Sequence, residues 1–188
     1  MNIQFATDEY NQALRAGQKE FRELSAAGQP THPAVLDELL PENGAHTVVD
    51  VGLIEIPSER IIGTKSAGRI AAFTPSFHPL LDPKSEFAAK WINLCAAHLG
   101  ETGITDPIAC YEYLGNFYVQ EGNKRVSVLR CFGAPRIPGQ VRRVMPAPSE
   151  DPRIRAYYEF LDFYKVSHLY TIQFRRPGDY AKLLGYLG

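Results

Sequence analysis

The chain has 188 residues, of which 45% are hydrophobic and 22% are charged. This is an ordinary globular composition, and the length is sufficient for one well-buried core with a small appendage. The formal net charge is −1, which excludes a protein that binds polyanions through its bulk charge. The longest apolar stretches are far too short to span a membrane.

Charge is distributed unevenly along the chain. Residues 1–119 carry 8 basic and 15 acidic side chains, a balance of −7, whereas residues 120–188 carry 12 basic and 6 acidic ones, a balance of +6. The basic part begins at the turn 121–125, and this position favours a phosphate-rich ligand at that turn.

The three cysteines, Cys95, Cys110 and Cys131, are odd in number and widely spaced. Their spacing predicts neither a disulfide framework nor a zinc site. The N-terminal residues show no basic region followed by an apolar run, so no signal peptide is indicated. We therefore expect a cytoplasmic protein with reduced thiols and no membrane partner.

The first third of the chain predicts helices followed by one strand. A helix is expected over 7–28, capped by Thr7, and a short helix over 34–40. Residues 47–56 are rich in β-branched side chains and read as a strand. Residues 58–81 contain several glycines and prolines and are expected to form a long irregular, functional loop.

The central third predicts a helix, a hairpin and a second helix. The first helix is expected over about 83–99, with Asp82 as its cap. Residues 107–113 and 117–121 read as a hairpin. A helix then begins at about residue 123 and ends at Gly133, a typical C-terminal cap.

The last third predicts one more strand and a helical extension. Residues 136–144 read as a strand, and Asp151-Pro152 begins a helix whose apolar residues lie nearly all round it. A short strand at 169–174 and a final helix from Gly178 are expected to follow. The chain stops on an apolar helix at Gly188, so we expect a further domain after it.

The turn after the hairpin carries the strongest functional signal. The expected strand ends at Glu121-Gly122 and the next helix begins at once, so that Lys124 and Arg125 fall in its first turn. Backbone N–H groups there lack helical partners, and the helix dipole adds positive potential. Two cations at such a place favour a bound phosphate. The candidate phosphate-binding residues are therefore Gly122, Asn123, Lys124 and Arg125.

Two further residues are candidates for the same site. Glu121 could orient Mg²⁺ or act as a base toward a hydroxyl, or it could only pair with a neighbouring cation. Arg69 follows Gly68 in the long loop and could close over a phosphate, or it could lie in a simple surface turn. No residue is predicted to be a direct protein ligand of a metal.

Five segments occur in an order that is known from one protein superfamily. They are an opening strand, an arginine-bearing loop, a Pro-Ile strand entry, a strand-acid-glycine-cation-helix signature and an Ile-Pro exit strand: Ile54–Ile61, Gly68-Arg69, Thr105–Ile108, Phe117–Val128 and Gly133–Val141. In this order the region from about Val51 to Val144 resembles the ParB/sulfiredoxin superfamily.

The resemblance implies an α+β fold with a small mixed sheet, helices packed around it and extra N- and C-terminal helices. The expected domains are an N-terminal helical arm at 1–45, a ParB/sulfiredoxin-like core at 46–148, and a C-terminal helical extension at 149–188 that packs on the core. The resemblance also implies a nucleotide or phosphate pocket at Gly122–Arg125.

The family's activities are diverse, so fold alone does not give function. Sulfiredoxin chemistry is not expected, because Asn123 stands where those enzymes place a reactive cysteine. The first hypothesis is a sensor or regulatory module that binds a nucleoside triphosphate, CTP or ATP, with Mg²⁺. The alternatives are a Mg²⁺-dependent kinase or NTPase and a DNA-binding accessory domain, although no helix-turn-helix follows the core.

Overall fold

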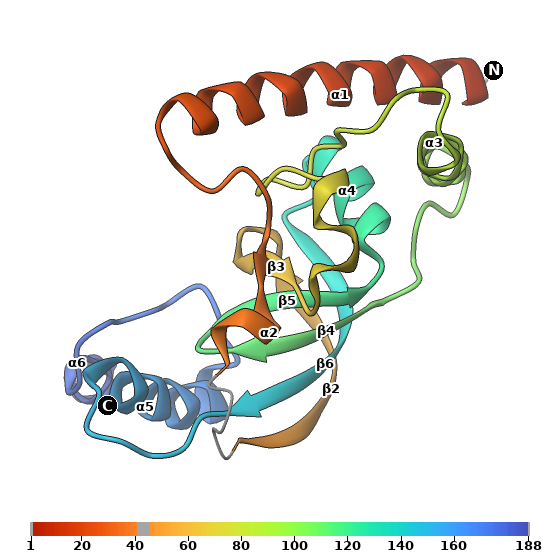
Figure 1. Ribbon diagram of the computed structural model, residues 1–188. Helices are drawn as coiled ribbons and strands as arrows, with labels where there is room; N and C mark the ends of the chain where they lie inside the picture. The colour runs from red at the N-terminus through yellow and green to blue at the C-terminus, as the bar shows by residue number, and fades with distance from the viewer. Residues whose placement is uncertain (1, 41–45, 188) are drawn as a thin grey trace.

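The computed structural model describes residues 2–40 and 46–187, which form a six-stranded mixed sheet with helices around it (Figure 1). The strand order is β1-β3-β5-β4-β6-β2. The strands are β1 (Ala34–Val35), β2 (Thr47–Pro57), β3 (Ile61–Thr64), β4 (Ile108–Tyr113), β5 (Asn116–Glu121) and β6 (Arg136–Met145). The α-helices are α1 (Asn2–Ala26), α2 (Leu36–Leu39), α3 (Glu86–His98), α4 (Asn123–Cys131), α5 (Pro152–Ser167) and α6 (Asp179–Leu187).

The sheet combines one tight hairpin with parallel pairings. β4 and β5 are antiparallel and are joined through Leu114 and Gly115, whose φ angles of 50° and 80° suit the turns that twist with a hairpin. β5 pairs in parallel with β3, and β4 pairs in parallel with β6. β2 closes one edge antiparallel to β6. The expected α+β class is therefore confirmed.

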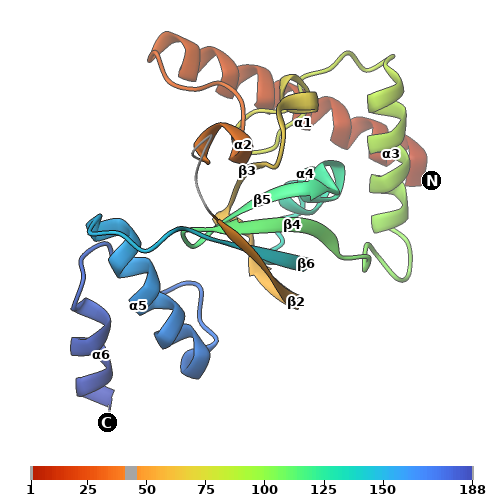
Figure 2. The same cartoon turned by 60° about the horizontal axis from the view of Figure 1, so that its bottom comes forward.

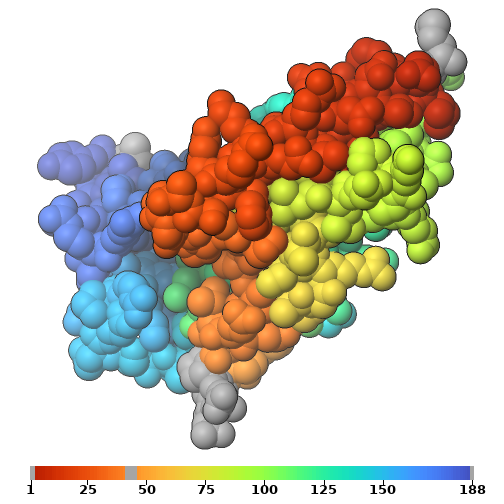
Figure 3. All heavy atoms as spheres, turned by 45° about the horizontal axis from the view of Figure 1, so that its top comes forward, coloured from red at the N-terminus to blue at the C-terminus, as the bar shows by residue number. Residues whose placement is uncertain are grey.

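The helices lie in two groups at opposite ends of the sheet. In Figures 1 and 2, α1 and α3 lie near α4 at one end, and α5 and α6 lie at the other. Figure 3 shows α1 packed along the segment that carries α3. Between these two helices the rings of Tyr10 and Trp91 meet edge to face, with centroids 5.3 Å apart.

The helix starts differ from the sequence-based expectation at two caps. Thr7 lies inside α1, where its hydroxyl donates to the carbonyl of Ile3 at 2.8 Å. Asp82 does not cap α3; its carboxylate accepts the N–H of Lys84 at 2.7 Å in a turn that precedes the helix. Ser85 is the cap, since its Oγ accepts the N–H of Ala88.

The later helix boundaries agree with the sequence. Asp151 caps α5 by accepting the N–H of Arg153, and a proline occupies the first turn. Gly133 has the left-handed φ of 69° expected after the end of α4. The N–H of Ala134 returns to the carbonyl of Leu129, which completes the helix end.

Three expected elements are different in the structure. The expected loop 58–81 contains strand β3, which lies between β1 and β5. The glycines of this segment had indicated a loop. Gly63 is nevertheless needed inside the strand, because a Cβ there would lie 2.2 Å from the Ala34 carbonyl oxygen. Residues 34–40 begin with the two-residue strand β1 before α2. Residues 169–174 form no strand; the side chains of Tyr170, Ile172 and Phe174 instead pack on the main core.

Two expectations concern chain that the structure leaves undescribed. The boundary between the N-terminal arm and the core falls within 41–45, and the expected further domain would follow Gly188. Across the ranges 2–40 and 46–187, no helix is both long and apolar enough to cross a membrane.

A buried ion pair within the sheet is hydrogen-bonded to two tyrosines of the C-terminal extension. Glu112 on β4 is fully buried, and its Oε2 lies 2.5 Å from Nε of Arg143 on β6. Tyr157 on α5 donates to the same carboxylate at 2.8 Å, while Tyr170 contacts the Arg143 guanidinium at 2.5 Å. Burial raises the pKa of Glu112, and the guanidinium acts against that shift. The carboxylate also accepts the N–H of Gly115 at 2.7 Å, so that its desolvation is offset by several donors.

The Tyr157 hydroxyl should therefore contribute measurably to stability. Tyr157→Phe keeps the buried ring but removes one donor from Glu112, so we expect the free energy of unfolding to fall by about 1–3 kcal/mol. Urea denaturation of the two proteins measures the difference. Tyr186, which is 88% exposed, provides the control, since Tyr186→Phe should change stability by less than about 0.5 kcal/mol. Equal stability of Tyr157→Phe and the wild type would contradict the importance of this network.

Candidate anion-binding site

The turn between β5 and α4 requires glycine at position 122. Gly122 has φ 105° and ψ 19°, a left-handed conformation that strains other residues. A Cβ at this position would also lie 2.7 Å from Cγ2 of Ile108. Glycine therefore lets β5 pass directly into α4 while its backbone lies against the neighbouring strand β4.

The start of α4 presents backbone donors. The first helical hydrogen bond runs from the N–H of Val126 to the carbonyl of Gly122 at 3.1 Å. The N–H groups of Asn123, Lys124 and Arg125 precede it, and no side chain of Gly122 exists to cap them. The dipole of this nine-residue helix adds positive potential at the same place.

One cavity gathers all the residues that the sequence indicated. Its volume is about 340 Å³, and its lining includes Arg69, Glu121, Gly122, Asn123, Lys124 and Arg125. Arg69 comes from the short helix η2 (Ala67–Ala72), far from α4 in sequence, and the fold brings it beside the turn. Phe73, Phe87 and Leu94 form an apolar wall of the same cavity.

Lys124 and Arg69 are two neighbouring cations that make no ion pair within the described residues, although the Glu86 carboxylate lies near them. The Lys124 ammonium lies 5.0 Å from the centroid of the Phe87 ring. Burial lowers the pKa of Lys124, and the positive charges of Arg69 and Lys90 add to this. Among the described residues neither Lys124 nor Arg69 makes an ion pair, because the nearby Glu86 binds Lys90 at 2.5 Å. An anion in the cavity would relieve this repulsion.

Arg125 and Asn123 have different surroundings from Lys124. The Nη1 of Arg125 donates to the backbone carbonyl of Pro107, and it lies 3.5 Å from the carbonyl of Asp106. Arg125 thus fastens the chain before β4 to the start of α4, and it also lines the cavity. The Oδ1 of Asn123 is buried and finds no hydrogen-bond donor in the part of the chain that the structure describes.

Helix α3 packs against α4, the helix that begins at the cavity. Its Trp91 is fully buried and donates from Nε1 to Oγ of Ser127 on α4 at 2.8 Å. α3 also supplies Phe87 and Lys90, which the sequence analysis did not assign to the site. A second cavity of about 360 Å³ adjoins the first and shares Arg69, Phe87 and Lys124 with it. The sequence could have indicated this, because residues 87 and 90 are three positions apart and therefore lie on one side of the predicted helix.

The cavity offers little to hold a metal by itself. In the ranges that the structure describes, no three histidine, cysteine, aspartate or glutamate side chains are grouped to bind a metal ion. Glu121 is exposed and contributes one carboxylate to the cavity. Mg²⁺ is commonly held by one or two carboxylates together with substrate phosphates. Glu121 therefore fits a Mg²⁺ ion that arrives with a phosphate ligand.

Comparison with known proteins found no relative of this chain. No protein-family model, no curated protein and no solved structure matches it. The functional argument consequently rests on the residues that line the cavity and on their charges.

Proposed function

We propose that the protein is a ParB/sulfiredoxin-like module that binds the triphosphate of a nucleotide, and that it acts as a sensor or regulatory domain. The observation that carries this proposal is the cavity in which Arg69 and Lys124 meet the open N–H groups of α4, while neither cation makes an ion pair among the described residues. The order of elements from β2 through α3, the hairpin and α4 to β6 supports the likeness to that superfamily.

Each group has a distinct part in the proposed binding. The guanidinium of Arg69 supplies a fork of donors for phosphate oxygens, and Lys124 supplies a point charge. The backbone N–H groups at residues 123–125 hold one phosphate at the helix start. Phe87 and Leu94 offer an apolar surface to the sugar or base. Because Arg69 is exposed on a short helix, it can move toward a ligand that enters.

Loss of either cation should weaken nucleotide binding. Titration calorimetry with CTP, ATP and inorganic triphosphate, each with and without Mg²⁺, compares the wild type with Arg69→Gln and Lys124→Gln. A charged hydrogen bond contributes about 1.5–3 kcal/mol, so we expect about a 10- to 100-fold loss of affinity for each variant.

Lys84 provides the control for this experiment. It is an exposed lysine just before α3 and lines neither of the two cavities. Lys84→Gln should bind as the wild type does. The proposed site is wrong if the three variants lose affinity equally, or if the wild type binds none of the three ligands.

The lowered pKa of Lys124 gives the binding a characteristic pH dependence. Because burial and neighbouring cations lower the pKa of this lysine from its usual value near 10.5, it loses its proton earlier as the pH rises. Triphosphate affinity should therefore fall with increasing pH before ordinary lysines titrate. Lys124→Arg remains charged over this range and should keep its affinity. Calorimetry across an alkaline pH series measures both, and identical pH profiles would exclude Lys124 as the titrating group.

A phosphoryl-transfer activity is the second candidate, because Glu121 lines the same cavity as Lys124. If Glu121 positions Mg²⁺ or accepts a proton, Glu121→Gln should lower Mg²⁺-dependent phosphate release from ATP by about 10²-fold or more with little change in nucleotide affinity. Glu101→Gln, at an exposed acid outside the cavity, is the control. Absence of phosphate release by the wild type would leave binding as the function and refute this candidate.

The DNA-binding alternative receives no support from the aromatic helix. Tyr157, Phe160 and Phe163 of α5 are buried in the main core, so their faces are not available for stacking with bases. DNA binding stays a prediction from the basic C-terminal part of the sequence.

A further inference from the structure

A separate cavity of about 410 Å³ lies where the C-terminal extension meets the sheet. It is at the end of the molecule that carries α5 and α6, away from α1 and α3 (Figure 2). The aromatic rings of Tyr157, Phe160, Phe174 and Tyr180 form its apolar wall. Its size and its mainly apolar wall are typical of pockets that bind small molecules.

Three arginines line this cavity, and one of them has a buried nitrogen without a hydrogen-bond partner in the described chain. They are Arg60 from the short helix η1 (Ser58–Arg60), Arg153 from α5 and Arg175 from the segment before α6. The Nε of Arg60 is inaccessible to solvent and makes no hydrogen bond within the described chain. A buried N–H of a charged group is costly to leave unpaired, so this guanidinium points to a missing acceptor.

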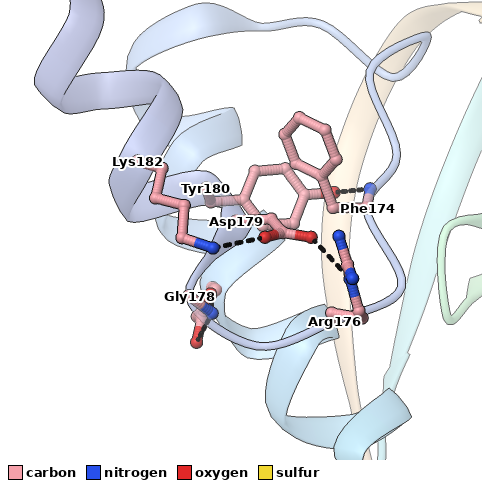
Figure 4. Close-up of polar contacts among 7 residues, drawn as sticks. Phe174, Arg176, Gly178, Asp179, Tyr180 and Lys182 are labelled. Atoms are coloured by element: carbon pink, nitrogen blue, oxygen red, sulfur yellow. Dashed lines mark hydrogen bonds and ion pairs between the residues drawn. The ribbon is translucent and has the colours of Figure 1, made fainter.

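Each acidic residue of the extension is already hydrogen-bonded or ion-paired within the protein. Asp151 binds Arg153, and Glu159 accepts the N–H of Gly178 at 2.7 Å. Figure 4 shows Asp179 between Lys182 and Arg176, at 3.1 and 3.3 Å. The two remaining acids of residues 149–188, Glu150 and Asp162, pair with Arg155 and Lys165.

As a result, the charges of Arg60 and Arg175 are not neutralised inside the described part of the chain. No aspartate or glutamate lines the cavity there. The hydroxyl of Tyr180 does not supply the missing acceptor either, because it already accepts the N–H of Phe174 at 3.0 Å (Figure 4) and donates to the carbonyl of Ile172 at 3.3 Å. The cavity thus combines an aromatic lining with the guanidinium groups of Arg60 and Arg175, which make no ion pair in the described chain.

We propose that this cavity is a second binding site, for a small organic anion with a flat apolar body. The acidic group, a phosphate or a carboxylate, binds Arg60 and Arg175, since guanidinium forks match both kinds of oxyanion. The flat body lies against the half-buried Phe174, and Asn116 and Gln173 line the same cavity. This site is independent of the proposed triphosphate site, with which it shares no lining residue.

The test is titration calorimetry of the full chain with phenyl phosphate and with benzoate, which separate the two possible acidic groups. Inorganic phosphate tests the acidic group without the flat body and should bind more weakly than phenyl phosphate. Arg60→Met and Arg175→Met should each lower the affinity for the preferred probe by about tenfold or more. Arg176→Met is the matched control, because Arg176 pairs with Asp179 and does not line the cavity.

Thermal stability distinguishes a ligand-binding arginine from a structural one. Without ligand, Arg60→Met should melt at the same temperature as the wild type or higher, because it removes a buried N–H that has no partner and keeps an apolar stem. With the probe present, only the wild type and Arg176→Met should gain stability. The proposal is overturned if neither probe binds, if Arg60→Met binds as tightly as the wild type, or if Arg69→Gln abolishes binding of the probe.

Discussion

The buried carboxylate of Glu112 is the point on which the arrangement of this protein depends. It receives the guanidinium of Arg143 from a neighbouring strand, the hydroxyl of Tyr157 from α5 and the backbone N–H of the hairpin turn. An isolated charge in such a place would be very unfavourable, so each of these donors has to stay in position. The C-terminal extension is consequently part of the same core as the sheet.

The two proposed sites are supplied by one continuous stretch of chain. Arg60 ends η1, strand β3 follows, and Arg69 lies in η2 just beyond it. Strand β3 is held between β1 and β5. Arg60, before this strand, therefore lies at the C-terminal extension, and Arg69, after it, lies at the start of α4. A segment that looked like an irregular loop thus contributes a cation to each end of the sheet.

The sequence predicted the elements whose ends are marked by local chemistry. Gly133 and Asp151-Pro152 mark helix ends correctly, because the backbone conformations and hydrogen bonds they provide do not depend on distant residues. Strand β3 could not be predicted in this way, since only β1 and β5 make it a strand. The segment 169–174 likewise depends on distant residues, because its side chains pack on the main core instead of joining the sheet.

The residues of the candidate site can also be separated into those placed by local sequence and those placed by distant residues. Gly122 and Lys124 were predictable from the helix start, whereas the direction of Arg125 depends on carbonyls that the preceding loop supplies. The single tryptophan of the chain, Trp91, is hydrogen-bonded to Ser127 on the helix that begins at the anion cavity. Because it is the single tryptophan, the tryptophan fluorescence of the protein reports on the contact between α3 and α4. The unlabelled protein carries its own optical reporter of any ligand that shifts α4.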